Sequence, residues 1–466
     1  MLHLLVALVS VANSVKATEL QDLEQLLEKF ERAAVVLQNN DGETVVAVNA
    51  DKPMVPASTQ KLLTGFLALG QWGEDYRATT EFYYNESTSS LRVIGKGDPF
   101  LVSEEIDLLA KELAVRLDGA TIASIQVDSS HFKHQPGLPW QGKTDNPYDA
   151  IPSALAANFN TMNLAVRNGR PVSNEEQTPL TRLAWQWSLQ QPGLAKTGEV
   201  DKQSGLPLLT PEEENIGRIN TGQDITFAAR YFGELLATFL WRHDARFVNE
   251  SGEVVQSTAK TGTHLPINML AKTVSIVQDN PETGRSIIAD GNRIQVLDDH
   301  GPTLYTHQNS RSLSTIVAGM LKYSTNFIAN NLALMLVAEG DGKAVDFDGF
   351  RSFAEKSVAE RFGWQDMLVD EGAGLSLANR LSGSQLVQLV EAYGPWQELL
   401  PVYKEFEFER TVLAKTGSLQ GVSTLAGIIE SGPGENYRFA ILLQDDSITD
   451  SKDRDSVLQL LIRLVR

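Results

Sequence analysis

Two residues at the start of an expected helix could carry acyl-transfer chemistry. Ser58 and Lys61 stand three positions apart, directly before the apolar run 62–69. At that spacing two helical side chains project from the same face. A serine hydroxyl is a weak nucleophile until a neighbouring base takes its proton. A lysine amine can be that base where burial and nearby cations lower its pKa. We therefore predict that Ser58 is the nucleophile and Lys61 its general base.

Two later motifs could complete such a site. Ser324-Thr-Asn326 is the one Ser-x-Asn pattern in the chain, and Lys415-Thr-Gly follows it at the end of an expected strand. We expect Ser324 to relay a proton to the leaving amine. We expect Asn326 to hold either the Lys61 ammonium or the substrate amide.

The third motif supplies charge and backbone donors. Lys415 is a second cation that would lower the pKa of Lys61, and with Thr416 it could bind a substrate carboxylate. Gly417 ends the motif and Ser418 follows it, and we expect both to line the substrate-binding site with Thr416. The backbone N–H groups of Ser58 and Ser418 are candidates for an oxyanion hole.

Short motifs also recur by chance, and this chain shows it. Ser-x-x-Lys is found again at 130–133 and 257–260, and Lys-Thr-Gly at 196–198 and 260–262. Only the copy at Ser58 opens an apolar helix, and only the Lys-Thr-Gly at 415 comes after Ser324. Residues 137–144 match the GxxxxGK[ST] phosphate-loop pattern, but no strand precedes them and Pro147 follows them. A phosphate loop needs a strand before it and a helix after it, so we reject nucleotide binding.

The elements that position these motifs are strongest at the two ends of the chain. A helix is expected at 19–32, a hairpin at 34–48 around Asp41-Gly42, and helices near 61–69 and 313–338. Strands are expected at 410–416, 423–429 and 437–443, paired antiparallel, followed by a helix at 456–465. Residues 76–290 are loop-rich, with 198–215 expected as an exposed linker or loop. We predict an α/β (α+β) domain with an antiparallel sheet flanked by helices, split by a large insertion that forms one or two extra domains.

Composition bounds the function. The chain has 466 residues, which exceeds one ordinary domain, and a formal net charge of −19 that disfavours nucleic-acid binding. It has no cysteine, which excludes a thiolate metal site and a cysteine nucleophile. Its histidines form no HExxH pattern and no close pair, which argues against a histidine metal site. Nothing else in the sequence gives a reason to expect a metal or an organic cofactor. Residues 4–12 are apolar but too short to anchor in a membrane. We predict a cleaved signal peptide at 1–17 and no transmembrane anchor.

The ordered motifs resemble those of the class C low-molecular-weight penicillin-binding proteins, the D-alanyl-D-alanine carboxypeptidase/endopeptidase family. Ser58 and Ser324 are 266 residues apart, and Ser324 and Lys415 are 91 apart. This spacing is similar to that of the family, which inserts two extra domains after the first motif. The resemblance implies a DD-peptidase domain at 18–75 and 291–466, with inserted domains at 76–290. It also implies action in the periplasm on peptidoglycan stem peptides and acylation by β-lactams.

Two positions depart from the family pattern. Thr325 replaces the usual Asp between Ser324 and Asn326, a change that we expect to be tolerated. Leu377 stands where the family commonly has an Arg that helps to hold the polar end of a diaminopimelate side chain. Asp145 or Asp149 of the insertion is a candidate acidic partner in that subsite.

Two other functions stay open at this point. A serine β-lactamase would use the same motifs but needs a water activated for deacylation, and no Glu-x-x-Leu-Asn segment is present to supply one. A non-catalytic peptidoglycan-binding protein could keep the fold, but it would not need Ser58, Lys61 and Lys415. The oligomeric state and the balance between carboxypeptidase and endopeptidase action are not indicated.

Overall fold

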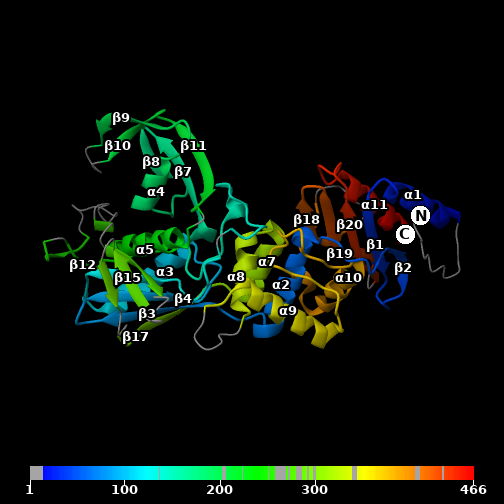
Figure 1. Ribbon diagram of the computed structural model, residues 1–466, viewed down its shortest axis with the longest axis horizontal. Helices are drawn as coiled ribbons and strands as arrows, with labels where there is room; N and C mark the ends of the chain where they lie inside the picture. The colour runs from blue at the N-terminus through cyan, green and yellow to red at the C-terminus, as the bar shows by residue number, and fades with distance from the viewer. Residues whose placement is uncertain are drawn as a thin grey trace. The chain divides into compact units, whose positions relative to one another are not determined.

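The computed structural model describes residues 14–135, 137–201, 206–222, 224–249, 251–257, 269–270, 273–279, 286–290, 293–296, 301–337, 344–404, 410–432 and 435–465. Figure 1 traces the chain from blue at the N-terminus to red at the C-terminus. The chain forms two compact units. The first unit is made of residues 1–76, 313–337 and 347–466, and the second of 77–312 and 338–346. Each unit has its own hydrophobic core.

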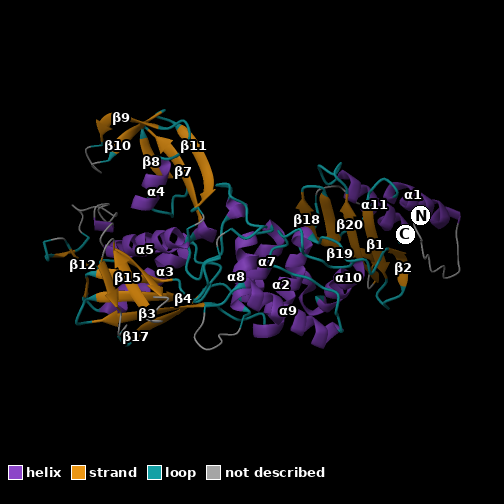
Figure 2. Cartoon of the chain, in the orientation of Figure 1, coloured by secondary structure: helices purple, strands orange, loops and turns teal. Residues whose placement is uncertain are grey.

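A five-stranded antiparallel sheet is the centre of the first unit (Figure 2). Its strands lie in the order β18 (Val412–Leu419), β19 (Val422–Gly432), β20 (Glu435–Gln444), β1 (Arg32–Gln38) and β2 (Thr44–Val48). Hairpins join β18 to β19, β19 to β20 and β1 to β2, as the sequence predicts. The pairing of β1 with β20, in which Val36 is opposite Ala440, brings the two ends of the chain into one sheet.

Helices cover both faces of this sheet. Alternate residues of a strand point to opposite sides, and apolar side chains on both sides are buried against helices. On one face, Val35 and Ile441 are buried in a core shared with α1 (Ser14–Leu27) and α11 (Lys452–Leu464). On the other face, α10 (Gly383–Ala392) lies so close that a Cβ on Gly383 would be 2.8 Å from Val36 Cγ2. Figure 2 shows α10 and α11 on opposite sides of the strands.

The helices that carry the first two motifs pack against one another in the first unit. η1 (Ala57–Gln60) leads directly into α2 (Lys61–Trp72), and residues 61–69 of α2 are all buried. A Cβ on Gly65 would lie 3.0 Å from Val317 Cγ1, so α2 and α7 (Leu313–Tyr323) pack closely. The other elements of this part are α8 (Asn326–Met335), α9 (Phe347–Phe362) and η4 (Gly394–Leu399).

The second unit is built around a seven-stranded mixed sheet. The strand order is β16 (Arg293–Val296), β15 (Ser286–Asp290), β14 (Val274–Asp279), β6 (Ser124–Asp128), β4 (Ser90–Gly95), β3 (Thr79–Asn85) and β17 (Thr303–Gln308). Two helices, α3 (Ser103–Leu117) and α5 (Ile225–Arg242), share the apolar core with β4, β6 and β14. The pair β14–β6 and the pair β6–β4 are parallel.

Smaller sheets complete the second unit. β11 (Glu214–Asn220), β7 (Thr161–Arg167) and β8 (Arg170–Ser173) form one, and β9 (Ala195–Val200) pairs with β10 (Pro207–Thr210). β13 (Val254–Val255), β12 (Arg246–Val248) and β5 (Thr121–Ile122) form another. The remaining elements are α4 (Arg182–Ser188), η2 (Pro147–Asp149) and η3 (Asn158–Asn160).

Three expectations differ from the structure or fall outside it. The expected linker at 198–215 is wrong in its described part, because it contains β10 and the ends of β9 and β11. The second unit runs past residue 290 to Ser312, because β17 pairs with β3. Residues 1–13 of the predicted signal peptide lie outside the described residues, and α1 begins at Ser14.

Candidate active site

Ser58 and Lys61 face each other at the junction of η1 and α2. Lys61 is fully buried, and its Nζ lies 2.8 Å from Ser58 Oγ. The 3₁₀ turn from Ala57 to Gln60 starts with Ala57 in the left-handed region, at φ 46°. The turn is fixed from inside, since the Thr59 hydroxyl donates to the Pro56 carbonyl at 2.6 Å. The contact between the Ser58 and Lys61 side chains that the spacing predicts is therefore present.

The Lys61 amine has three hydrogen-bond partners from three separate segments. Its Nζ also donates to Asn326 Oδ1 at 2.8 Å and to the Ala373 carbonyl at 2.7 Å. An ammonium group has three donors, so Ser58, Asn326 and Ala373 together satisfy it. The second motif thus reaches Lys61 through Asn326, the first residue of α8.

Ser324 and Lys415 form the second pair of the site. Lys415 is 1% exposed, and its Nζ donates to Ser324 Oγ at 2.9 Å and to the Thr416 carbonyl at 2.6 Å. Ser324 has φ 55°, a left-handed conformation in the turn between α7 and α8. Thr325 is the N-cap residue of α8 and makes no side-chain cap.

Strand β18 lies against the turn that carries Ser58. A Cβ on Gly417 would be 2.8 Å from Ser58 N and would overlap Thr424 Oγ1. The Thr424 hydroxyl itself donates to the Pro56 carbonyl at 2.8 Å, which ties β19 to the same turn. Only glycine permits this approach, and Ser418 follows it as an exposed residue. The structure thus brings all three motifs together in the first unit.

Burial and charge set the basicity of the amine. Burial lowers the pKa of Lys61 well below its usual range, and the neighbouring Lys415 ammonium lowers it further. The Glu371 carboxylate opposes both effects, because a negative charge favours the ammonium form. A lysine with a lowered pKa has more of the neutral amine that a general base requires.

Glu371 is a residue of this site that the motifs did not indicate. Its carboxylate is fully buried and accepts N–H groups of Ala373, Gly374 and Leu375 at 2.7–2.9 Å. The Asn379 side chain donates to it as well, at 2.9 Å. These hydrogen bonds hold the 371–375 loop in the conformation in which the Ala373 carbonyl accepts from Lys61. The signal in the sequence was an acid at the start of a Gly-rich run, 371–374.

That loop also contains the position where the family pattern is broken. Leu377 is 64% exposed, and its carbonyl accepts from Arg380 at 2.6 Å.

The acidic candidates Asp145 and Asp149 both belong to the second unit. Asp149 accepts from the backbone N–H of Thr144 at 3.3 Å, so its carboxylate is held within the 137–149 segment. In this described segment the backbone forms turns and the 3₁₀ turn η2.

Neither a cluster of metal ligands nor a membrane-spanning helix is found among the described residues. Among them, no group of three or more His, Cys, Asp or Glu residues is placed to hold a metal ion. None of the helices in the part of the chain that the structure describes is long and apolar enough to cross a membrane.

Comparison with known proteins decides the family. The sequence model of the D-Ala-D-Ala carboxypeptidase 3 (S13) family matches residues 13–198 and 288–464. The chain belongs to this family. This S13 protein is therefore a serine-type D-Ala-D-Ala carboxypeptidase, and the resemblance that its motifs indicated is confirmed.

Individual relatives agree over almost the full length. The chain is 25% identical to the D-alanyl-D-alanine carboxypeptidase of Actinomadura sp. strain R39, covering 91% of this chain and 81% of that protein. It superposes on penicillin-binding protein 4 of Haemophilus influenzae with a TM-score of 0.64, at 18% identity, covering 95% of this chain and 97% of the other. The same protein complexed with a β-lactam gives a TM-score of 0.58, at 17% identity and the same coverage. These likenesses confirm the predicted fold class. The roles of individual residues in this S13 carboxypeptidase stay predictions.

Proposed function

We propose that Ser58 is the nucleophile of this carboxypeptidase and that Lys61 is its general base. The observation that carries the proposal is the set of partners around Lys61 Nζ. Two of them, Asn326 Oδ1 and the Ala373 carbonyl, can only accept hydrogen bonds. When the amine is neutral, its two N–H groups satisfy these acceptors and its lone pair faces Ser58 Oγ. The hydroxyl is the partner that can give up a proton.

The reaction then runs through an acyl-enzyme. Ser58 Oγ attacks the carbonyl carbon of the penultimate D-Ala while its proton passes to Lys61 Nζ. The Oγ–C bond forms, the C–N bond to the terminal residue breaks, and the proton returns to the leaving nitrogen through the hydroxyl of Ser324. Water then cleaves the ester, which releases the shortened peptide and restores the Ser58 hydroxyl.

Charged and backbone groups around Ser58 suit such a substrate. Lys415 with Thr416 would bind the terminal carboxylate, because an ammonium group next to a hydroxyl stabilises that charge. The N–H groups of Ser58 and Ser418 would receive the oxyanion, and the close approach of Gly417 to Ser58 N supports this arrangement. Lys415 would also keep the pKa of Lys61 low.

The substrate class follows from the family. We propose that the enzyme cleaves D-Ala–D-Ala termini and D-Ala–meso-diaminopimelate cross-links of peptidoglycan stem peptides, and that β-lactams acylate Ser58. The names of its relatives, a D-alanyl-D-alanine carboxypeptidase and a penicillin-binding protein seen with a β-lactam, support this. The predicted signal peptide at 1–17 supports action in the periplasm.

The experiment is incubation with defined muropeptides, both monomeric pentapeptide and cross-linked dimer, read by mass spectrometry. Loss of one D-Ala from the monomer and splitting of the dimer are expected. The Ser58→Ala variant should do neither. Turnover by a folded Ser58→Ala variant would refute the assignment, and cleavage of the monomer alone would refute the endopeptidase part.

A further inference from the structure

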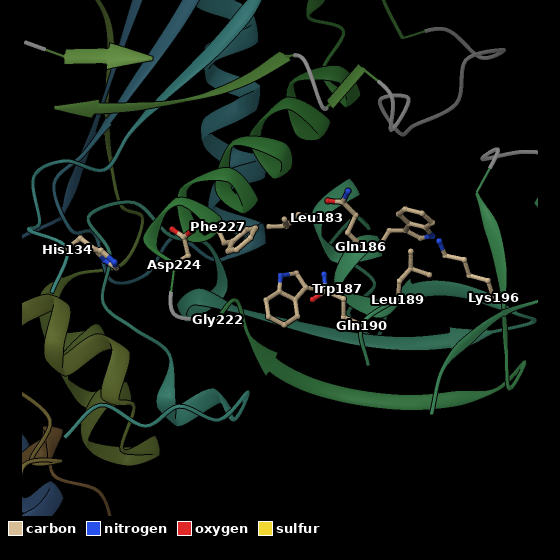
Figure 3. Close-up of a pocket in the computed structure, with 11 residues that line it drawn as sticks. His134, Leu183, Gln186, Trp187, Leu189, Gln190, Lys196, Gly222, Asp224 and Phe227 are labelled. Atoms are coloured by element: carbon tan, nitrogen blue, oxygen red, sulfur yellow. The ribbon is translucent and has the colours of Figure 1, made fainter. Parts of the chain in front are cut away.

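The second unit contains a cavity with a volume of about 1040 Å³ that is separate from the catalytic residues. Most of its wall comes from α4 and the turn after it, with further residues from the start of α5, from β9 and from the loop after β6 (Figure 3). The lining residues are His134, Leu183, Trp185, Gln186, Trp187, Leu189, Gln190, Lys196, Gly222, Asp224 and Phe227. The volume is at the upper end of the range of about 300–1,000 Å³ that small-molecule sites occupy.

Helix α4 is held firmly, so its outer face is a fixed surface. The Thr181 side chain caps the helix by accepting from Ala184 N, and the buried Glu234 carboxylate accepts from Leu183 N at 2.8 Å. Leu183 and Ala184 are part of the core of the second unit. With that face anchored, Trp185, Gln186 and Gln190 line the cavity.

The aromatic surface inside the cavity is also preorganised. The Trp187 and Phe227 rings meet edge to face, with centroids 6.4 Å apart at 75°. Gly222 packs against the indole with φ +88°, and a Cβ there would lie 3.2 Å from Trp187 Cζ2. Figure 3 shows Trp187 beside Gly222 and near Phe227. A larger residue at 222 would be strained and would crowd the ring.

The polar groups of the cavity are available to a ligand. Among the described residues, the side chains of Gln186, Gln190 and Lys196 have no hydrogen-bond or ion-pair partner. Trp185 Nε1 is a buried donor that no described group accepts from. Asp224, by contrast, is already engaged, because its carboxylate accepts from Thr226 N at the start of α5. The unpartnered polar side chains of the cavity are therefore mainly the amides of Gln186 and Gln190, which both donate and accept hydrogen bonds, with Lys196 as the one unpaired charge among the described lining residues.

We infer that this cavity binds the glycan of peptidoglycan, a chain of N-acetylated amino sugars. Indole faces pack against the apolar faces of sugar rings, and glutamine amides match hydroxyl and acetamido groups, which also both donate and accept. A charged ligand would need more than the single free cation Lys196 among the described lining residues. The inference rests on the proposed function, because the stem peptides that the enzyme cleaves are carried on such a glycan.

Binding of N-acetylglucosamine tetramer to the full-length protein tests the inference, by calorimetry and by tryptophan fluorescence. Saturable binding is expected, with affinity reduced about tenfold or more in the double variant Gln186→Ala/Gln190→Ala. The matched control is Gln365→Ala, an exposed glutamine of the first unit, which should bind the sugar like the wild type. Absence of binding by the wild type, or equal affinity in the double variant, would overturn the inference.

A second measurement separates this inference from the catalytic proposal. The double variant should cleave intact sacculi more slowly relative to free pentapeptide than the wild type does, because only the former substrate carries glycan. An unchanged ratio would contradict glycan binding at this cavity. Fluorescent penicillin labelling of the same samples reports the catalytic site alone. A wild-type protein that binds the sugar but takes no label would contradict the proposed function and leave the cavity assignment standing.

Discussion

Lys61 Nζ and Ser58 Oγ lie 2.8 Å apart, and the other two partners of that nitrogen are acceptors that cannot give up a proton. The geometry therefore directs the lone pair of the neutral amine to the hydroxyl. Burial of the whole lysine side chain makes the neutral form accessible. The consequences can be measured residue by residue.

Replacing Lys61 by Met should slow acylation strongly while the fold is kept. Methionine is similar in length and suits a fully buried position, so packing is largely retained. Loss of a general base costs about 10²–10⁴-fold in rate, and the acylation rate with a chromogenic β-lactam measures it. Lys356→Met, at an exposed position of α9, is the control and should acylate normally. Rapid acylation of a folded Lys61→Met variant would place the base elsewhere.

Replacing Glu371 by Gln should move the pH profile of acylation to lower pH. The Glu371 carboxylate raises the pKa of Lys61, against the larger lowering by burial and Lys415. Removing the negative charge lets the amine lose its proton at lower pH, so the acidic limb shifts in that direction. Stopped-flow acylation across pH measures the shift. A limb that stays in place, or moves to higher pH, would contradict this role.

The same variant has a cost in stability that should be measured separately. The carboxylate accepts several N–H groups of its own loop, and a Gln side chain has one acceptor oxygen in place of two. We expect a loss of about 1–3 kcal/mol in the free energy of unfolding, the range for a buried group left unpaired. Denaturant unfolding measures it, and an unchanged midpoint would contradict the structural role of the carboxylate.

Gly374→Ala should disturb the site by sterics alone. Gly374 has φ +84°, and a Cβ there would overlap the Ala57 carbonyl oxygen and lie 3.1 Å from Ser58 N. We expect about 1–3 kcal/mol of destabilisation, together with slower acylation, because the turn that carries Ser58 must shift. The control is Gly70→Ala on the exposed side of α2, where a Cβ meets nothing within 4 Å. That change should be neutral or stabilise by up to about 1 kcal/mol. Equal effects of the two substitutions would rule out the close approach.

Leu377→Arg should change side-chain preference and leave stability within about 0.5 kcal/mol, since the position is 64% exposed. A guanidinium group can bind a carboxylate with two parallel hydrogen bonds, which leucine cannot. We expect the rate on diaminopimelate-containing peptides to rise relative to peptides with an uncharged side chain. Competition between the two peptides, followed by mass spectrometry, gives the ratio. A ratio that does not move would show that residue 377 does not contact this side chain.

Local patterns were enough to predict the parts of the site that lie on one element or on two consecutive ones. The three-residue spacing of Ser58 and Lys61 fixes their common face whatever the rest of the chain does. The last three strands are separated by short turns, so their antiparallel pairing follows from sequence adjacency. The order of the motifs then indicated that they would converge.

Contacts between distant segments were beyond such patterns. Nothing in residues 32–38 indicates that β1 pairs with β20 rather than with another strand. The role of Glu371 depends on a loop conformation in which one carboxylate accepts several backbone N–H groups, and this has no periodic signature. Strand β9, which enters the range 198–215, is exposed along its whole length, so the usual apolar–polar alternation of a strand is missing there.

The most direct test of the account is the site of penicillin attachment. The wild-type protein is incubated with benzylpenicillin, digested, and mapped by tandem mass spectrometry. One adduct is expected, on Ser58; it should be absent from Ser58→Ala and should decay slowly, as a peptidase acyl-enzyme does. An adduct on another residue, or one that persists in Ser58→Ala, would contradict it.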